Sequence, residues 1–212
     1  MKKNKKTTGI LAAILIVLVV IVAAIIIVFS VRGKKKSTES TTETIDAAGK
    51  HHVEIQVKNY GTIKVELDGD TAPITVANFL KLAQNGFYDG LTFHRIIDGF
   101  MIQGGDPKGN GTGGSDETIK GEFSGSGVEN NISHVRGTIS MARSQDMDSA
   151  SSQFFIVQSD STYLDGQYAG FGTVTEGMDI VDQICKDTPV QDSNGTVSAS
   201  DQPVIESIKV ID

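Results

Sequence analysis

The sequence predicts a mainly β domain that follows a single membrane-spanning helix. Short apolar stretches separated by glycine-rich or polar turns recur through the C-terminal three quarters of the chain, which is typical of a barrel or sandwich. Apolar residues alternate with polar ones between Val53 and Leu67, as in half-buried strands. An unbroken apolar run extends from Ile10 to Phe29. We therefore expect two structural parts.

The N-terminal part divides into a basic tail at residues 1–9, a transmembrane anchor at 10–31 and a polar linker at 32–50. At about 1.5 Å per residue, the apolar run matches the roughly 30 Å hydrocarbon core of a bilayer. A cleaved signal peptide would have a shorter apolar region that ends in small residues. Here Ala23 and Ala24 lie inside the run, so we expect an uncleaved anchor.

Lysines and arginines flank the anchor on both sides, so the positive-inside rule is nearly balanced. A lone N-terminal anchor before a large domain usually acts as an export signal. We expect a single-pass protein of the cell membrane whose domain, residues 51–212, is extracytoplasmic.

Charge changes sign along the chain. Eight of the 19 Lys and Arg residues precede residue 37, whereas none of the 26 Asp and Glu residues do. Residues 37–212 therefore carry 11 basic and 26 acidic side chains, a net charge of −15. Such a domain repels phosphate backbones, which argues against nucleic acid as a partner. The only cysteine, Cys185, excludes an internal disulfide.

In the first elements of the domain, apolar residues recur at regular spacing. Val53–Val57 and Ile63–Leu67 form two predicted strands around a turn at 59–61. A helix is expected to start at Pro73, since proline is tolerated in the first turn, and to stop at Asn85-Gly86.

The later elements are shorter. Five apolar stretches are candidate strands, at residues 91–97, 100–103, 138–142, 154–158 and 171–174. Apolar residues at helical spacing predict a second helix over 178–185, and residues 204–211 are expected to form the last strand.

Three other functions have weak signals. Gly109–Gly114 matches the dinucleotide fingerprint formally, but no apolar-faced helix follows it. No paired C-x-x-C or H-E-x-x-H motif accompanies the four histidines, so we expect no metal. The nucleophile elbow of a Ser-His-Asp hydrolase is missing around Ser126.

The stretch Phe93–Asp106 interleaves charged and apolar residues without a clean period. An unpaired buried charge is costly, so Arg95 and His94 either have structural partners or face a pocket. On spacing alone, an arginine held in an ion pair remains an alternative to a functional one.

At these residues the sequence resembles the cyclophilin family, in particular bacterial-like and membrane-anchored members. The resemblance runs in order from about Val53 to the C-terminus. Besides residues 93–106, the matching segments are Thr118–Phe123, Gly137–Ala142, Ser152–Ile156, Leu164–Gly166 and Phe171-Gly172. The resemblance implies an eight-stranded antiparallel β-barrel capped by two helices, with an external groove. It also implies peptidyl-prolyl cis-trans isomerase activity that assists protein folding.

The resemblance assigns Arg95 as the catalytic residue. It implies that the proline ring is bound by an apolar pocket, consisting of Phe100, Met101, Phe154, Leu164 and Phe171. Gln103 would support Arg95, and the backbone around Ala142 and Arg143 would hold the residue before proline. The remaining substrate-binding residues are His94, Gln153 and Tyr168. No metal or cofactor is implied, and we expect a monomer that acts on proline-containing polypeptides.

Two positions depart from many relatives. Tyr163 and Tyr168 stand where cyclosporin-sensitive members have Trp and His, so cyclosporin binding is doubtful. Arg143 stands where many relatives have Asn, and we hypothesise that it favours acidic substrates. The alternative function is a non-catalytic chaperone module that binds proline peptides through the same groove.

Overall fold

The computed structural model describes residues 46–212. The predicted tail, the anchor at 10–31 and most of the linker lie outside the described residues. Within residues 46–212, no helix has both the length and the apolar character needed to cross a membrane.

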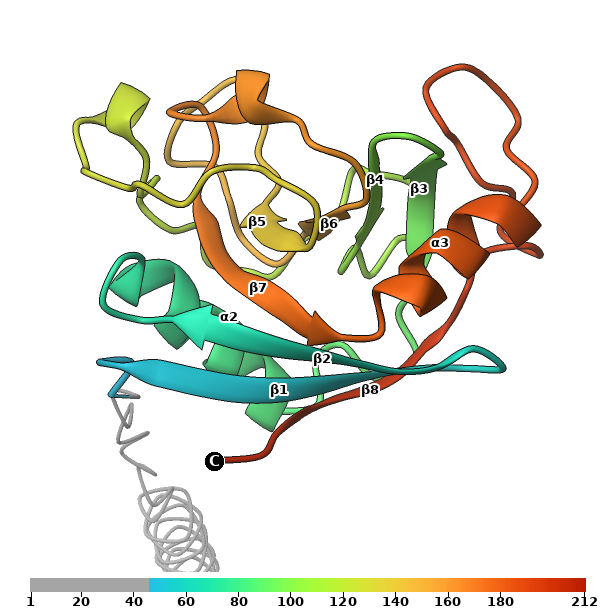
Figure 1. Cartoon of the computed structure of the whole chain (residues 1–212), viewed down its shortest axis with the longest axis horizontal. Coiled ribbons are helices and arrows are strands. Elements are labelled where there is room, and N and C mark those ends of the chain that lie inside the picture. Colours follow the sequence, from blue (N-terminus) through green and yellow to red (C-terminus); the bar gives the residue numbers. More distant parts are fainter. Residues whose placement is uncertain (1–45) are drawn as a thin grey trace, which may run out of the picture. The chain divides into compact units, whose positions relative to one another are not determined.

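The described residues form one antiparallel sheet of eight strands with two α-helices (Figure 1). The strands are β1 (Lys50–Val57), β2 (Gly61–Asp68), β3 (Phe93–Ile97), β4 (Met101–Gly104), β5 (Thr138–Met141), β6 (Phe154–Val157), β7 (Gly170–Glu176) and β8 (Ile205–Val210). Their order across the sheet is β3-β4-β6-β5-β7-β2-β1-β8. The helices are α2 (Pro73–Gln84) and α3 (Met178–Asp187), and two 3-10 turns, η1 (Ser124–Ser126) and η2 (Thr162–Leu164), lie in loops.

The β1–β2 hairpin follows the predicted period. Every second residue of β1 from Val53 and of β2 from Ile63 is buried, and Val53 pairs with Val65. The turn needs left-handed backbone at Asn59, whose φ is 66°. Asparagine is among the few residues that adopt this conformation readily. The predicted turn at 59–61 is therefore confirmed.

Helix α2 begins and ends where the sequence predicts. Pro73 occupies its first turn, and Gly86 follows its end with φ of 67°. The carboxylate of the buried Glu122 accepts hydrogen bonds from the backbone N–H groups of Ile74, at 3.0 Å, and Thr75, at 2.7 Å. These N–H groups have no partner within the helix, so Glu122 both satisfies them and offsets the positive end of the helix dipole.

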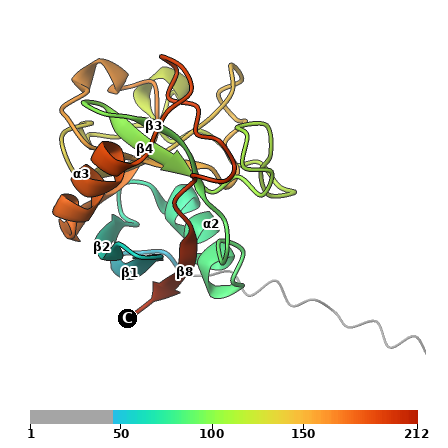
Figure 2. The same ribbon diagram turned by 90° about the vertical axis from the view of Figure 1, so that its right-hand side faces the viewer.

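The sheet curls strongly (Figures 1 and 2), and the segments at the starts of its edge strands β3 and β8 meet. A single bridge joins Thr92 to Val204, supported by a 2.9 Å hydrogen bond from Phe93 N to Pro203 O. The predicted barrel is thus a curled sheet that meets at a short bridge, without a continuous ladder between its edges. Helix α2 packs near β8 and β2, and α3 packs near β2 on a separate side.

Two apolar clusters lie on the two faces of this sheet. The larger one fills the inside of the curl and contains most of the buried aromatic rings. The smaller one consists of the buried Met101, Phe155 and Val157 with partly exposed neighbours. The smaller cluster belongs to the candidate site.

Candidate active site

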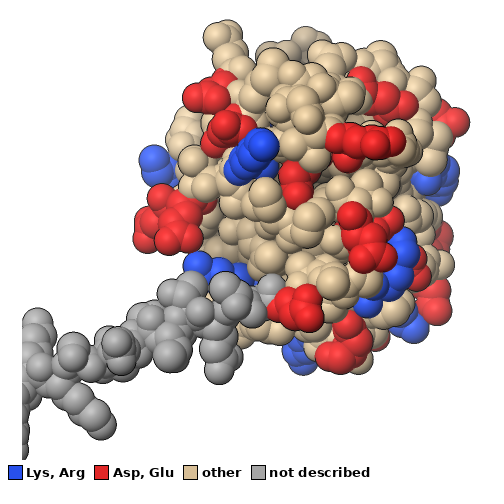
Figure 3. All heavy atoms as spheres, turned by 90° about the vertical axis from the view of Figure 1, so that its left-hand side faces the viewer, with Lys and Arg blue, Asp and Glu red and all other residues tan. Residues whose placement is uncertain are grey.

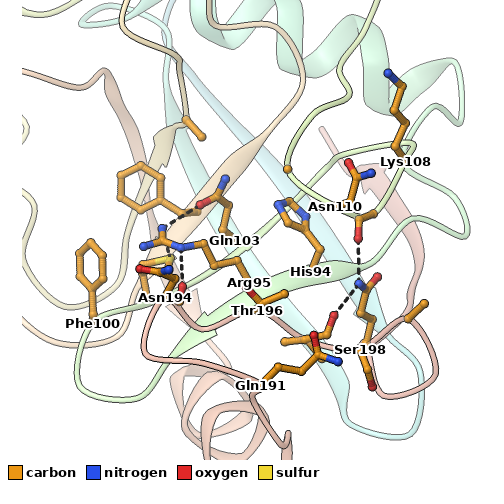
Figure 4. Close-up of a pocket in the computed structure, with 18 of the residues that line it drawn as sticks. His94, Arg95, Phe100, Gln103, Lys108, Asn110, Gln191, Asn194, Thr196 and Ser198 are labelled. Atoms are coloured by element: carbon orange, nitrogen blue, oxygen red, sulfur yellow. Dashed lines mark hydrogen bonds between the residues drawn. The ribbon is translucent and has the colours of Figure 1, made fainter.

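A cavity of about 760 Å³ opens beside β3 and β4 (Figure 4). This volume lies within the range of pockets that hold small ligands. It is lined by nine of the residues that the sequence assigns to the groove: His94, Arg95, Phe100, Met101, Gln103, Ala142, Arg143, Leu164 and Tyr168. Gln153 lines an adjoining hollow that shares Gln103, Ala142 and Arg143 with the cavity.

One wall of the cavity is apolar. Phe155 and Met101 form its buried base, while Phe100 and Leu164 pack against them from the rim. The ring of Tyr168 meets Phe155 edge to face, with centroids 5.9 Å apart and an interplanar angle of 87°. A small apolar ring placed here would be removed from water on several sides, which is a favourable environment for it.

Two predicted pocket residues do not line the cavity. Phe154 and Phe171 are fully buried in the inner core, where their ring centroids lie 5.4 and 5.2 Å from that of Phe79. Successive side chains of a strand point to opposite faces of the sheet. Phe155, one residue along β6, therefore faces the cavity. The assignment of Phe154 and Phe171 to the pocket was wrong, because both rings lie in the inner core.

Arg95 is held from two sides. Its Nη1 donates to Gln103 Oε1 at 3.1 Å, because β3 and β4 place these two residues opposite each other. Its Nε donates to the carbonyl oxygen of Asn194 at 2.8 Å. Nη2 has no hydrogen-bond acceptor among residues 46–212 and is therefore available to a ligand. Burial lowers the pKa of Arg95, yet an arginine side chain remains a cation at neutral pH.

A chain of amide groups fixes the orientation of Gln103. Its Nε2 donates to Gln153 Oε1 at 2.9 Å, and Gln153 Nε2 donates to the carbonyl oxygen of Gly113 at 2.7 Å. Because each amide donates at one end and accepts at the other, Gln103 must present its oxygen to Arg95.

The residues around Asn194 were not predicted to belong to the site. Both oxygens of the Asp192 carboxylate bind this turn, accepting from Asn194 N at 2.9 Å, Thr196 N at 3.1 Å and Thr196 Oγ1 at 2.9 Å. Gly195 has φ of 77°, and a Cβ there would lie 2.2 Å from the carbonyl oxygen of Ile96. Asn194-Gly195 is a recognisable turn sequence, but no local pattern places it beside Arg95.

His94 lies under the floor of the cavity with only 5% of its surface exposed. Neither ring nitrogen has a hydrogen-bond partner among the described residues. Burial lowers the pKa of His94, so the ring is neutral at neutral pH.

Arg143 is fixed against aromatic rings. Its guanidinium carbon lies 4.8 Å from the ring centroid of Tyr168 and 5.1 Å from that of Phe123. Nε donates to Gln167 O at 2.9 Å, and Nη1 donates to Ser144 O at 2.8 Å. Arg143 thus braces Tyr168, one wall of the cavity.

His134 supports the apolar wall from behind. Its ring stacks on Phe155, with centroids 6.0 Å apart and planes 19° apart. Nδ1 lies 2.8 Å from Asp165 Oδ1, and Nε2 lies 2.9 Å from Ser140 Oγ. Asp165, His134 and Ser140 are thus connected as the Asp, His and Ser of a hydrolase triad are. Ser140, however, is completely buried and cannot reach a substrate. Their role here is structural.

Within residues 46–212, no cluster of three His, Cys, Asp or Glu side chains is placed to hold a metal ion. The arrangement that the structure provides is instead an apolar wall beside a guanidinium with a free donor. Such a site can bind a small ring and donate a hydrogen bond to an atom next to it.

Known proteins resemble this chain in both sequence and fold. The family model described as "Cyclophilin type peptidyl-prolyl cis-trans isomerase/CLD" matches residues 52–210. Peptidyl-prolyl cis-trans isomerase B of Bacillus subtilis is 51% identical over 117 residues, which are 55% of this chain and 78% of that protein. A probable peptidyl-prolyl cis-trans isomerase of Brucella suis is 41% identical over 179 residues, 79% and 87% of the two chains. A Cryptosporidium parvum cyclophilin-type isomerase crystallised in the presence of the dipeptide Ala-Pro superposes with a TM-score of 0.67 and 32% identity, covering 76% of this chain and 99% of that one.

Proposed function

Because this chain belongs to the cyclophilin family and is a peptidyl-prolyl cis-trans isomerase, we propose that it acts on exported or surface polypeptides and assists their folding. The single observation that carries the catalytic role is the guanidinium of Arg95, held beside the apolar wall with Nη2 unengaged. The other two nitrogens of its guanidinium position it, and the third is left for the substrate.

Rotation about a peptide bond meets a barrier of about 18 to 20 kcal/mol, because resonance gives the C–N bond double-bond character. Uncatalysed X-Pro isomerisation takes about 10 to 100 s at 25 °C. In the proposed mechanism, the apolar wall of Phe100, Met101, Phe155 and Leu164 binds the proline ring. The carbonyl group of the preceding residue then rotates relative to the fixed ring.

Arg95 favours the twisted state over both planar isomers. As the amide twists, resonance is lost and the proline nitrogen gains a lone pair that can accept a hydrogen bond. An interaction that is stronger in the transition state than in either ground state accelerates the reaction. A hydrogen bond to a charged group contributes about 1.5 to 3 kcal/mol. Since about 1.4 kcal/mol is a factor of ten, Arg95 supplies about ten- to a few hundredfold.

The rest of the acceleration comes from positioning. Gln103 and Asn194 orient the guanidinium before the substrate arrives, so little reorganisation is needed during the reaction. Isomerisation makes and breaks no covalent bond, so the chemistry needs no nucleophile, metal or cofactor. All groups of this mechanism come from one chain, which supports action as a monomer.

The membrane location is part of the proposal. The apolar run from Ile10 to Phe29 supports an anchor, and the following domain would then act on chains near the membrane. Prolyl isomerisation is slow enough to be a rate-limiting step of folding, so an isomerase near the membrane would speed the folding of exported chains. Protease treatment of intact cells should remove residues 51–212 if the domain is extracytoplasmic, and protection of the domain would contradict that location.

The test of catalysis is the isomerisation of a short Ala-Pro peptide by the full-length protein in detergent. We expect Arg95→Ala to lower kcat/KM at least tenfold while the circular dichroism spectrum stays unchanged. Arg95→Lys keeps the charge but loses the two-sided hydrogen bonding, so it should restore little activity. A folded wild-type protein that binds the peptide without accelerating its isomerisation would favour the chaperone alternative.

A further inference from the structure

We propose that the turn at residues 106–112 binds an acidic side chain of the substrate near the proline, with Lys108 and Asn110 as its donors. This inference rests on the proposed binding of proline peptides in the cavity. It adds a preference among those peptides to the isomerase activity.

The cavity extends well beyond the apolar wall that would hold a proline ring. Past Arg95 it continues between the turn at 108–111 and the loop at 191–202 (Figure 4). This far part is lined mostly by polar side chains and glycines, with Val197 and Ala199 as its apolar residues. A peptide residue extends the chain by about 3.3 to 3.6 Å. Neighbours of the proline therefore reach this part of the cavity.

Charges are distributed unevenly between the cavity and the remaining surface. Residues 46–212 contain 11 Lys and Arg and 24 Asp and Glu, and Figure 3 shows acidic side chains spread over one face of the molecule. Within residues 46–212, in contrast, the cavity lining includes Arg95, Lys108 and Arg143 and no acidic residue. A site of one sign attracts ligands of the opposite sign, and low-dielectric walls strengthen the attraction.

Asp106 builds the turn. Its carboxylate is buried and accepts backbone hydrogen bonds from Lys108 at 2.8 Å, Asn110 at 3.1 Å and Gly111 at 2.6 Å. These three bonds bend the backbone around the carboxylate. The side chains of Lys108 and Asn110 are left exposed on the outside of the turn, at the same edge of the cavity (Figure 4).

The amide of Asn110 has a defined orientation. Its Oδ1 accepts from Thr112 N at 3.0 Å and from Thr112 Oγ1 at 2.7 Å. Because only the amide oxygen can accept these bonds, Nδ2 must point the other way. Nδ2 donates to no acceptor within the described part of the chain.

Among the cations that line the cavity, Lys108 is the one whose charged group has no partner within residues 46–212. Nε and Nη1 of Arg95, and likewise of Arg143, already donate to acceptors in the protein. Among residues 46–212, by contrast, Lys108 Nζ forms neither an ion pair nor a hydrogen bond. Its flexible stem passes Gly113, where a Cβ would lie 3.1 Å from Lys108 Cγ. The ammonium can therefore turn towards a ligand in the cavity or in the adjoining hollow.

A carboxylate matches this pair of donors. It has two acceptor oxygens, one for an ammonium and one for an amide N–H, and charge-assisted hydrogen bonds are stronger than neutral ones. An acidic side chain would also meet no carboxylate among the residues that line the cavity. A glutamine of the same shape gains the amide contact but not the ion pair.

The experiment compares proline peptides that carry Glu or Gln at each of the two positions on either side of the X-Pro pair. Isomerisation by the full-length protein is measured at low and at physiological salt. We expect at least one position where Glu gives about two- to fivefold higher kcat/KM than Gln, the range for a partly exposed ion pair. The preference should shrink with salt, as screening requires.

Three variants test which residues cause the preference for Glu over Gln. Lys108→Gln should abolish it, and Asn110→Asp should reverse it, because aspartate keeps the acceptor for Thr112 but repels the acidic side chain. Lys209→Gln removes an equivalent exposed charge on β8 and should leave the preference unchanged.

An equal rate for Glu and Gln at every position would overturn the proposal, and so would a preference that survives Lys108→Gln. Isomerisation of the Gln peptides is the separate test of the proposed function. If no peptide is isomerised, the same Glu-to-Gln ratio can be read from dissociation constants.

Discussion

The carbonyl oxygen of Asn194 accepts a 2.8 Å hydrogen bond from Nε of Arg95, although 99 positions separate the two residues in the chain. The turn that presents this carbonyl is itself held by Asp192. Next to it, Ile96 N donates to Gly195 O at 2.8 Å, so the turn also pairs with β3. The orientation of Arg95, the proposed catalytic side chain, thus depends on a loop whose own side chains have no part in the proposed mechanism.

Removing the Asp192 carboxylate should therefore reduce catalysis through Arg95. We expect Asp192→Ala to lower kcat several-fold with a smaller change in KM, because the proline wall is untouched. The measurement is the kcat and KM of Ala-Pro peptide isomerisation. Ser193→Ala, an exposed neighbour in the same turn, is the matched control. A change confined to KM would show that Asp192 acts on substrate binding instead.

Phe154 and Phe155 should respond differently to truncation. Phe154 fills the inner core, so Phe154→Ala should lower the free energy of unfolding by about 3 to 5 kcal/mol. Phe155→Ala removes the base of the cavity wall and should raise KM for proline peptides with a smaller loss of stability. Urea denaturation and peptide titration of both variants would check this. Equal effects of the two variants on KM would contradict the assignment.

Stability should fall as the pH drops below about 6.5. Burial lowers the pKa of both His94 and His134 in the folded protein, while the unfolded histidines keep their ordinary pKa of about 6.5. Between the two pKa values the unfolded state binds more protons, so acid favours unfolding. The stability that the two neutral histidines contribute is fully present above about pH 6.5. It is lost as the pH falls from there to their pKa values in the folded protein.

The measurement is urea denaturation between pH 7.5 and 5, a range above the titration of ordinary carboxylates. His94→Gln should flatten the pH dependence, since one of the two groups is then absent. A free energy of unfolding that is constant over this range would contradict the lowered pKa values.

Cyclosporin should bind weakly. Tyr163 stands where sensitive relatives have Trp, and 65% of its surface is exposed beside Phe100, with ring centroids 6.1 Å apart. A tyrosine there cannot supply an indole N–H donor. We expect Tyr163→Trp to increase the affinity, measured by inhibition of isomerisation. If the wild-type protein binds as tightly as the variant, the indole N–H is unimportant in this chain.

Much of the fold could be predicted because the spacing of apolar residues within short segments distinguishes strands from helices. The alternation of β1 and β2 and the helical spacing of α2 and α3 are visible within a dozen residues, and their limits agree with the structure within a few residues. The segment around Arg95 was identifiable because it mixes charged and apolar residues in a way that neither a core nor a surface requires.

Other features could not be predicted from local sequence. All four residues of β6 are buried, so no alternation of polar and apolar residues tells Phe154 from Phe155. One of them faces the core and the other the cavity, and only the register of the sheet decides which. The contact between Asn194 and Arg95 joins distant segments, and no local pattern encodes it.

The pairing of β3 with residues near the C-terminus has a consequence for synthesis. Val197 N donates to His94 O at 3.1 Å, and Val204 forms its bridge with Thr92, which lies 112 positions earlier in the sequence. A ribosome makes β3 long before it makes these partners, and domains fold as units during synthesis. The nascent chain therefore carries Arg95 without its support, and the isomerase becomes competent only after the segment from Asp192 to Val204 has left the ribosome.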